Sequence, residues 1–129
     1  MAKALLDTSV LLAFIFGEAH DVHEDAVLAG GAIAAVNLAE TISVLQQKGA
    51  SETEIADTLR ELNLTVLPFT EAMAAAAGKL IPPARKLNIG LGDCACIATG
   101  LILQLPIYTA DRDWLKLDSG ASITLIRNN

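Results

Sequence analysis

The sequence predicts an α/β fold in which helices cover both faces of a parallel sheet. Short apolar segments alternate along the chain with segments of helical periodicity, and the links between them are short. A length of 129 residues suits one compact domain spanning 1–129, and a hydrophobic content of 53% supplies a buried core and excludes disorder. No repeat, linker or low-complexity segment in the sequence divides the chain.

Each expected element has a local signal. The strands are short apolar runs, and the third ends at a proline: residues 4–6, 32–36, 64–68, 106–109 and 122–126. The helices have apolar stripes at helical spacing and begin or end at capping residues: residues 10–16, 21–28, 38–48, 52–62, 71–80, 91–104 and a short helix at 112–116. Pro82 and Pro83 are expected to break the helix that begins at Glu71.

Two of these helices have more specific expectations. Asn37 is expected to be the N-cap of the helix over 38–48, and Glu40 follows it at the capping-box position. The helix over 21–28 is expected to turn an apolar stripe toward the core, made of Val22, Ala26 and Ala29. His20 and His23 have a spacing that could hold a metal ion, but the neighbouring acids favour a solvated surface.

The helix over 91–104 is apolar on every side and is expected to be buried, yet its first turn contains Asp93. Gly90 is its expected N-cap, and its small residues would let a neighbouring strand or helix approach closely. Cys94 and Cys96 cannot form an ordinary disulfide within one helix, so we expect reduced core cysteines. Alone, Asp93 is explained by the helix dipole, which stabilises such an acid by roughly 0.3–1 kcal/mol.

The formal net charge of −6 at pH 7 argues against a general nucleic-acid coat protein, which would have an excess of basic residues. It leaves open a nucleic-acid enzyme with an acidic, metal-filled site, or a protein with a basic partner. No small-residue cleavage site follows the apolar run over 10–16, and no run approaches the roughly 18 apolar residues of a membrane span. We therefore expect a cytoplasmic protein without a membrane segment.

Four acids are expected to meet at the carboxyl edge of the sheet. Asp7 and Asp111 directly follow strands, while Glu40 and Asp93 lie in the first turns of helices that run antiparallel to the strands. A helix of about 14 residues spans roughly 21 Å, so the Asp93 helix can cross the sheet and lead into the strand at 106–109. This edge is where open α/β sheets bind ligands.

Four carboxylates close together would repel one another at neutral pH unless a cation lay among them. Mg²⁺ and Mn²⁺ are hard divalent ions that prefer oxygen ligands, and either suits such a site. No His or Cys accompanies the acids, which disfavours zinc. A magnesium site of this kind usually handles phosphates, because the ion bridges carboxylates to substrate oxygens and can activate water. The acids therefore predict metal-dependent chemistry on a phosphate.

Four motifs together resemble the signatures of PIN-domain ribonucleases, in particular the VapC toxins of bacterial toxin–antitoxin modules. They are Leu5-Leu6-Asp7-Thr8-Ser9, Asn37-Leu38-Ala39-Glu40, Gly90-Leu91-Gly92-Asp93 and Thr109-Ala110-Asp111-Arg112-Asp113-Trp114, and they extend along the whole chain. The resemblance implies a three-layer α/β/α fold with a five-stranded parallel sheet in the order 3-2-1-4-5. It also implies Mg²⁺-dependent cleavage of structured RNA such as tRNA or rRNA, a homodimer, and inhibition by a cognate antitoxin protein.

The resemblance further assigns roles to the four acids. Asp7 and Asp93 would be the principal metal ligands, and Asp111 would be a further ligand. Glu40 would complete the catalytic set of Asp7, Glu40, Asp93 and Asp111. Asp113 is a weaker candidate than Asp111, because the family motif matches the first acid of this pair.

Two hydroxyl residues and one glycine of these motifs carry no charge, and they would affect how the acids are positioned. Ser9 and Thr109 would orient carboxylates or phosphate oxygens through hydrogen bonds, although both are also ordinary turn or cap residues. Many members of the family have asparagine in place of Ser9 and serine in place of Gly90. Neither departure removes a carboxylate.

Other functions remain open from the residues themselves. A non-catalytic PIN-fold binding module would keep the fold and dimer and act only through a protein partner, and a phosphohydrolase for small phosphoesters would use the same acids. A receiver-like domain normally needs a lysine after a late strand, where this chain has only Arg112. Lys79, Arg85 and Lys86 form a local positive cluster in the sequence. This cluster either lies on a solvated surface or contacts phosphate groups.

Overall fold

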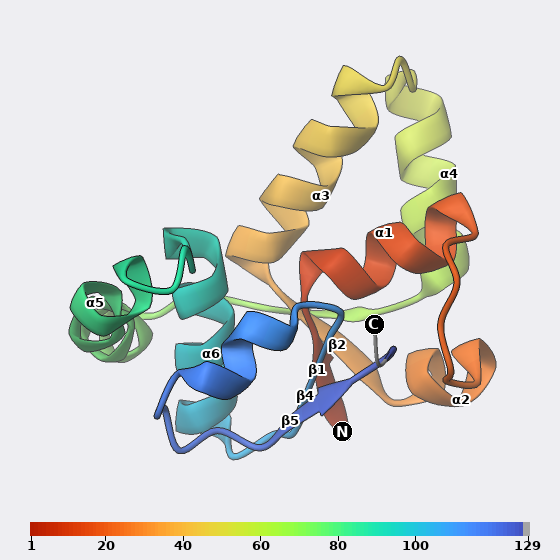
Figure 1. The fold of residues 1–129 in the computed structure, drawn as a ribbon. Coiled ribbons are helices and arrows are strands. Elements are labelled where there is room, and N and C mark those ends of the chain that lie inside the picture. The colour runs from red at the N-terminus through yellow and green to blue at the C-terminus, as the bar shows by residue number, and fades with distance from the viewer. Residues whose placement is uncertain (128–129) are drawn as a thin grey trace.

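The chain alternates strands and helices from end to end, and the computed structural model describes residues 1–127 (Figure 1). Residues 128 and 129 of the predicted domain lie outside the described part. The elements are β1 (Ala4–Leu6), α1 (Thr8–Phe16), α2 (Glu24–Ala29), β2 (Gly31–Ala34), α3 (Ala35–Gln47), α4 (Glu52–Leu62), β3 (Thr65–Leu67), α5 (Glu71–Arg85), α6 (Leu91–Leu103), β4 (Ile107–Thr109), the 3₁₀-helix η1 (Arg112–Lys116) and β5 (Ile123–Leu125).

The five strands form one sheet in the order β3-β2-β1-β4-β5, and every pairing is parallel. This confirms the predicted strand order. Strand β1 lies at the centre, where Leu5 pairs with Ala32 on one side and Ile107 on the other. All three residues of β1 are buried, as expected for a central parallel strand that is covered on both faces.

Alternate side chains of the strands point to two separate cores. Leu5 belongs to the core under α5, α6 and η1, whereas Leu6 belongs to the core under α1 and α2. Figure 1 shows α5 and α6 on one side of the sheet and α1 and α2 on the other, while α3 and α4 extend beyond one edge. The predicted three-layer α/β/α architecture is therefore confirmed. Within residues 1–127, no helix combines the length and hydropathy needed to cross a membrane.

Helix α5 continues through Pro82 and Pro83 to Arg85, so the predicted break at the prolines is wrong. Each proline removes an N–H donor, which leaves the carbonyls of Gly78 and Lys79 without their helical partners. Residues 78, 79, 82 and 83 are all exposed, so water can bond these carbonyls. The buried Ala84 holds the end of the helix against the core.

Helix α2 is shorter than predicted and turns a different residue inward. It begins at Glu24, and Val27 is buried, whereas Ala26 and Ala29 of the expected stripe are exposed. Val22, which precedes the helix, is partly buried against the core as expected. Valine removes more apolar area from water than alanine does, which favours this rotation of the helix. The expectation of a solvated His20 is also wrong, because its side chain is only 12% exposed and packs edge-on against Phe14.

The small residues of α6 allow the close packing that the sequence predicts. The cysteines of this helix are buried and free. A Cβ atom built on the buried Gly100 would lie 2.5 Å from Ile107 Cδ1, which is well inside van der Waals contact. Gly78, on α5, has nothing within 4 Å of the same position.

We expect Gly100→Ala to lower the free energy of unfolding by about 1–3 kcal/mol, because the new methyl group overpacks the contact with β4. Gly78→Ala should instead raise the free energy of unfolding by roughly 0.5–1 kcal/mol through helix propensity. Urea denaturation of both variants measures the two changes. Equal effects at the two glycines would contradict this account of how α6 packs.

Candidate functional site

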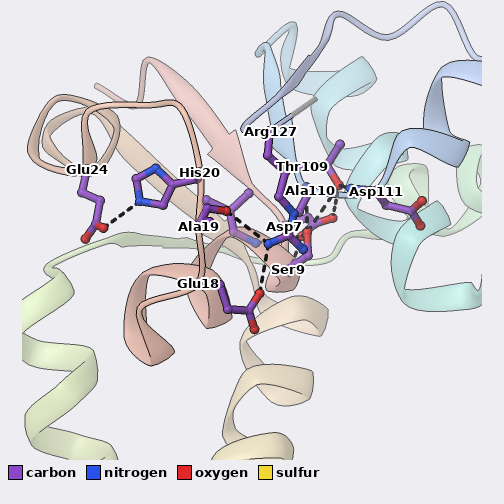
Figure 2. A network of polar contacts seen from close by, with 11 residues as sticks. Asp7, Ser9, Glu18, Ala19, His20, Glu24, Thr109, Ala110, Asp111 and Arg127 are labelled. Atoms are coloured by element: carbon purple, nitrogen blue, oxygen red, sulfur yellow. Dashed lines mark hydrogen bonds and ion pairs between the residues drawn. The ribbon is translucent and has the colours of Figure 1, made fainter. Parts of the chain in front are cut away.

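Asp7 lies directly after β1 and is the N-cap of α1, at the carboxyl edge of the sheet. Its side chain is 3% exposed, yet both carboxylate oxygens have donors. Oδ1 accepts hydrogen bonds from the backbone N–H of Ser9 and from Ser9 Oγ at 2.6 Å, and Oδ2 accepts one from Thr109 Oγ1 at 2.6 Å. Figure 2 shows these side chains converging from α1 and the end of β4. The two hydroxyl residues therefore orient this carboxylate.

The same hydroxyl groups connect Asp7 to Asp111. Ser9 Oγ accepts a hydrogen bond from the Ala110 N–H at 2.9 Å, and Thr109 Oγ1 accepts one from the Asp111 N–H at 3.1 Å. Asp111 is the N-cap of η1, and its side chain accepts a hydrogen bond from the Asp113 N–H at 2.9 Å. The segment that contains Asp111 is therefore held next to Asp7 by a continuous chain of hydrogen bonds (Figure 2).

Glu40 reaches the site from the second turn of α3, not from a capping box. The helix begins at Ala35, so the prediction that Asn37 is its N-cap is wrong, and strand β2 ends earlier than predicted. Asn37 instead donates from Nδ2 to Glu40 Oε1 at 2.8 Å and to the carbonyl of Gly92 at 3.1 Å. Thr8 Oγ1 lies 3.1 Å from the same Glu40 oxygen.

Asp93 lies in the first turn of α6, and Gly90 is the N-cap as predicted. Asp93 Oδ2 accepts a hydrogen bond from the Gly90 N–H at 3.1 Å. Next to it, a Cβ atom on Gly92 would lie 2.2 Å from Glu40 Oε2, so only glycine leaves room for that carboxylate. The second turn of α3 and the first turn of α6 thus bring Glu40 and Asp93 to the same edge of the sheet.

The electrostatics of the site show that three of the acids act on Asp93. Burial, and to a smaller extent the charges of Asp7, Glu40 and Asp111, raise the pKa of Asp93 from 3.8 to about 6, against the hydrogen bond from Gly90. Burial also raises the pKa of Asp7, although the bonds from Ser9, Thr109 and Val10 oppose the rise. The other three negative charges are therefore close enough to destabilise the ionised form of Asp93.

The donor set fits a hard divalent cation better than any other metal ion. The site consists of carboxylate and hydroxyl oxygens, which suit Mg²⁺ and Mn²⁺. Within the described residues, no three His, Cys, Asp or Glu side chains converge tightly enough to form a ready-made metal cluster. A carboxylate with a raised pKa nevertheless gains most from a nearby positive charge, which favours Asp7 and Asp93 as ligands. Asp111 remains the third predicted ligand.

Other residues considered from the sequence lie in different surroundings. Asp113 pairs with Lys116 at 3.0 Å, and both side chains are largely solvent-exposed. His20 Nε2 lies 2.8 Å from Glu24 Oε2 (Figure 2). His23 instead caps α2, so the two histidines have separate partners. The positive cluster on and after α5 is exposed: Lys79, Arg85 and Lys86.

A second polar network, part of which is drawn in Figure 2, connects the segment between α1 and α2 to Ile126 and Arg127. Arg127 Nη1 donates to Glu18 Oε1 at 3.1 Å and to the carbonyl of Ala19 at 3.4 Å. The Asp21 N–H donates to the carbonyl of Ile126 at 2.7 Å. These contacts anchor the segment that follows α1.

Sequence reasoning missed the roles of three residues around Glu40. Thr8, Asn37 and Gly92 all contact it or its neighbours, but each had an adequate local explanation as a turn, cap or helix-start residue. The motifs that contain them are the only signal the sequence offers. Their partners lie on other helices, so local spacing could not reveal the contacts.

The raised pKa of Asp93 predicts a pH-dependent stability for the metal-free protein. Because the folded-state pKa exceeds the unfolded value, the stability that the protonated carboxyl contributes is complete below about pH 3.8 and is lost as the pH rises through about 6. Asp93→Asn should therefore stabilise the fold more at pH 8 than at pH 5. The expected difference is about 1 kcal/mol, because solvent screening reduces the effect at this partly exposed group.

Urea denaturation in EDTA at the two pH values measures this difference. An Asp93→Asn effect that is the same at pH 5 and pH 8 would show that the carboxyl does not titrate as the structure indicates.

Comparisons with solved structures find the same fold in toxin–antitoxin proteins. A VapBC family member from Mycobacterium tuberculosis, VapBC-5, is 27% identical and has a TM-score of 0.64, with 99% of this chain and 100% of that chain covered. A DNA-bound VapBC from Salmonella typhimurium has a TM-score of 0.79 at 20% identity, with 97% and 98% covered. VapBC2 from Rickettsia felis, bound to a promoter DNA fragment, has a TM-score of 0.72 at 12% identity, with 95% and 97% covered.

At 20% and 12% identity, the latter two similarities establish the fold alone. The comparison with curated proteins found no match. The model of the PIN domain family, however, matches residues 4–120, which include all four acids and the whole sheet apart from β5. The resemblance inferred from the motifs is thus confirmed at the level of the family, and the chain belongs to the PIN-domain family.

Proposed function

We propose that this chain is a metal-dependent endoribonuclease that acts as the toxin of a VapBC-type toxin–antitoxin module. One observation carries the proposal: helices α3 and α6 and the ends of strands β1 and β4 bring Glu40, Asp93, Asp7 and Asp111 to one edge, where burial and the charges of the other three acids raise the pKa of Asp93. Perturbed acids at the carboxyl edge of a parallel sheet are typical of a functional site. Membership of the PIN-domain family and the similarity to VapBC structures support the assignment to a nuclease toxin.

In this proposal Asp7, Asp93 and Asp111 hold Mg²⁺, or Mn²⁺ in its place, and Glu40 completes the catalytic set. When bound, the ion neutralises the carboxylates, binds phosphate oxygens and favours the ionised form of a nearby water. Ser9 and Thr109 keep the Asp7 carboxylate in one orientation. The reaction is hydrolysis of a phosphodiester, in which water attacks phosphorus in line with the departing 3′ oxygen.

The proposed partners are structured RNA, such as tRNA or rRNA, a second copy of the chain in a homodimer, and a cognate antitoxin. The related structures are of VapBC systems, and some of these were solved with DNA. A net charge of −6 suits a basic antitoxin segment, whose arginine could lie among the carboxylates in place of the metal ion. Sequencing of RNA ends after brief expression of the chain alone would identify the RNA target.

We expect Asp7→Asn and Asp93→Asn each to reduce RNA cleavage by roughly a hundredfold or more, because each removes a charge from the proposed metal site. Excess EDTA should have the same effect, and added Mg²⁺ or Mn²⁺ should restore cleavage. A gel assay of purified protein with tRNA and rRNA measures the rates, and thermal melting confirms that the variants fold.

The matched control is Asp57→Asn, an exposed acid on α4 that pairs with Arg60 and lies outside the proposed site. Its cleavage rate should equal that of the unsubstituted protein. Full cleavage by Asp93→Asn, or in excess EDTA, would refute the proposal. Absence of cleavage by the unsubstituted protein with any RNA and metal ion, together with retained partner binding, would favour the non-catalytic module.

A further inference from the structure

Asn37 is buried at the contact between α3 and α6, and its amide has a defined orientation. The side chain is 1% exposed. Two oxygen atoms lie near the amide nitrogen, Glu40 Oε1 at 2.8 Å and the Gly92 carbonyl oxygen at 3.1 Å. A carboxylate and a carbonyl oxygen accept hydrogen bonds and do not donate them. The nitrogen must therefore face them, and these two bonds use both hydrogens of the amide.

The backbone of Asn37 is also held from two sides. Its carbonyl accepts hydrogen bonds from Thr8 Oγ1 at 3.0 Å and from Thr41 Oγ1 at 2.8 Å. The Thr8 hydroxyl lies as close to Glu40 Oε1, at 3.1 Å, so its one proton is shared between the two acceptors. Residues from α1, α3 and α6 thus meet at one asparagine.

These contacts leave Glu40 little freedom, although it is an exposed residue. One oxygen is bonded to Asn37, and the other fills the space that a side chain at residue 92 would need. Gly92 precedes Asp93 in the first turn of α6. The position of the Glu40 carboxylate relative to Asp93 is therefore set by Asn37 and Gly92 together.

The remaining oxygen of Asn37 indicates that this amide serves more than packing. Oδ1 is buried and has no hydrogen-bond partner among residues 1–127. An unsatisfied buried acceptor destabilises a fold, so an asparagine with only a structural role is a poor choice here. The amide nitrogen, not the oxygen, makes the contacts with the acidic site.

We propose that Asn37 is a positioning residue that holds the Glu40 carboxylate against the first turn of α6, where its negative charge strengthens the binding of a divalent cation by Asp7, Asp93 and Asp111. The inference rests on the proposed function, because it concerns the same acidic site. Outer-shell residues that position the groups around a metal site typically change metal affinity by about 10- to 100-fold when they are removed. Asn37 acts through Glu40 and is not itself a ligand.

The test is the binding of Mn²⁺ to metal-free protein, measured by titration calorimetry well below the melting temperature. Asn37→Ala should weaken binding by about 10- to 100-fold. In the cleavage assay, the Mg²⁺ concentration for half-maximal rate should rise, while the rate at saturating Mg²⁺ recovers most of its value. Thr99→Val is the matched control, because it removes a buried hydroxyl from α6 that bonds the Ala95 carbonyl and should leave Mn²⁺ affinity unchanged.

A double variant separates positioning from an independent contribution. In a Glu40→Gln background, Asn37→Ala should cause little further loss of Mn²⁺ affinity, because the carboxylate that Asn37 holds is already gone. Losses that multiply would overturn the proposal. If Asn37→Ala does not fold, Thr8→Val tests the same network, with an expected loss of about tenfold that Thr8→Ser restores. Unchanged affinity in Thr8→Val would then overturn it.

Asp93→Asn distinguishes failure of this inference from failure of the proposed function. Mn²⁺ binding that is lost in Asp93→Asn but unchanged in a folded Asn37→Ala variant would overturn the role of Asn37 alone. Binding that is undetectable, or unaffected by Asp93→Asn, would overturn the proposed function and the role of Asn37 with it.

Discussion

Burial of the Asp7 carboxylate is the constraint on which the site and much of the fold depend. A carboxylate removed from water is strongly destabilising unless donors surround it. Asp7 obtains these donors from the first turn of α1 and from Thr109 at the end of β4. Strands β1 and β4 must therefore be neighbours and must end together, which the parallel register of Leu6 with Tyr108 achieves. The sheet order and the geometry of the acidic edge are thus consequences of one another.

Ionised Asp93 does not stabilise the metal-free fold. Burial and three neighbouring negative charges raise the pKa of Asp93 to about 6, so ionisation of this carboxyl at neutral pH destabilises the fold. A fold selected for stability alone would place a neutral residue there, because the N-cap of α6 is already provided by Gly90. Functional sites commonly retain such electrostatic strain, and a bound cation would relieve it.

The contact between α3 and α6 adds a second level of organisation to the site. Glu40 is held by an amide and a hydroxyl, and it lies against a glycine that has no room for a side chain. A protein that only binds a partner through its surface has no need to restrain one exposed carboxylate so closely. The arrangement therefore favours chemistry at this edge over a purely structural or scaffolding role, in agreement with the PIN-domain family.

The sequence alone determined the alternation of strands and helices, the burial of α6 and the positions of Asp7, Asp93 and Asp111. These features follow from local signals, since strand ends, N-caps and apolar periodicity are read from adjacent residues. The start of α3 could not be predicted in the same way. Ala34 offers no side-chain cap, and Asn37 resembles a cap while its side chain is engaged elsewhere.

Only the tertiary structure decided how the acids are held and how the helices end. Asn37 bonds the carbonyl of Gly92, which lies 55 residues later in the chain. Asp7 accepts a hydrogen bond from Thr109, which lies 102 residues later. Helix α5 likewise passes through two prolines because its exposed carbonyls can bond water and Ala84 is buried in the core. Hydrogen bonds between distant segments depend on packing, and packing is a property of the whole chain rather than of any local pattern.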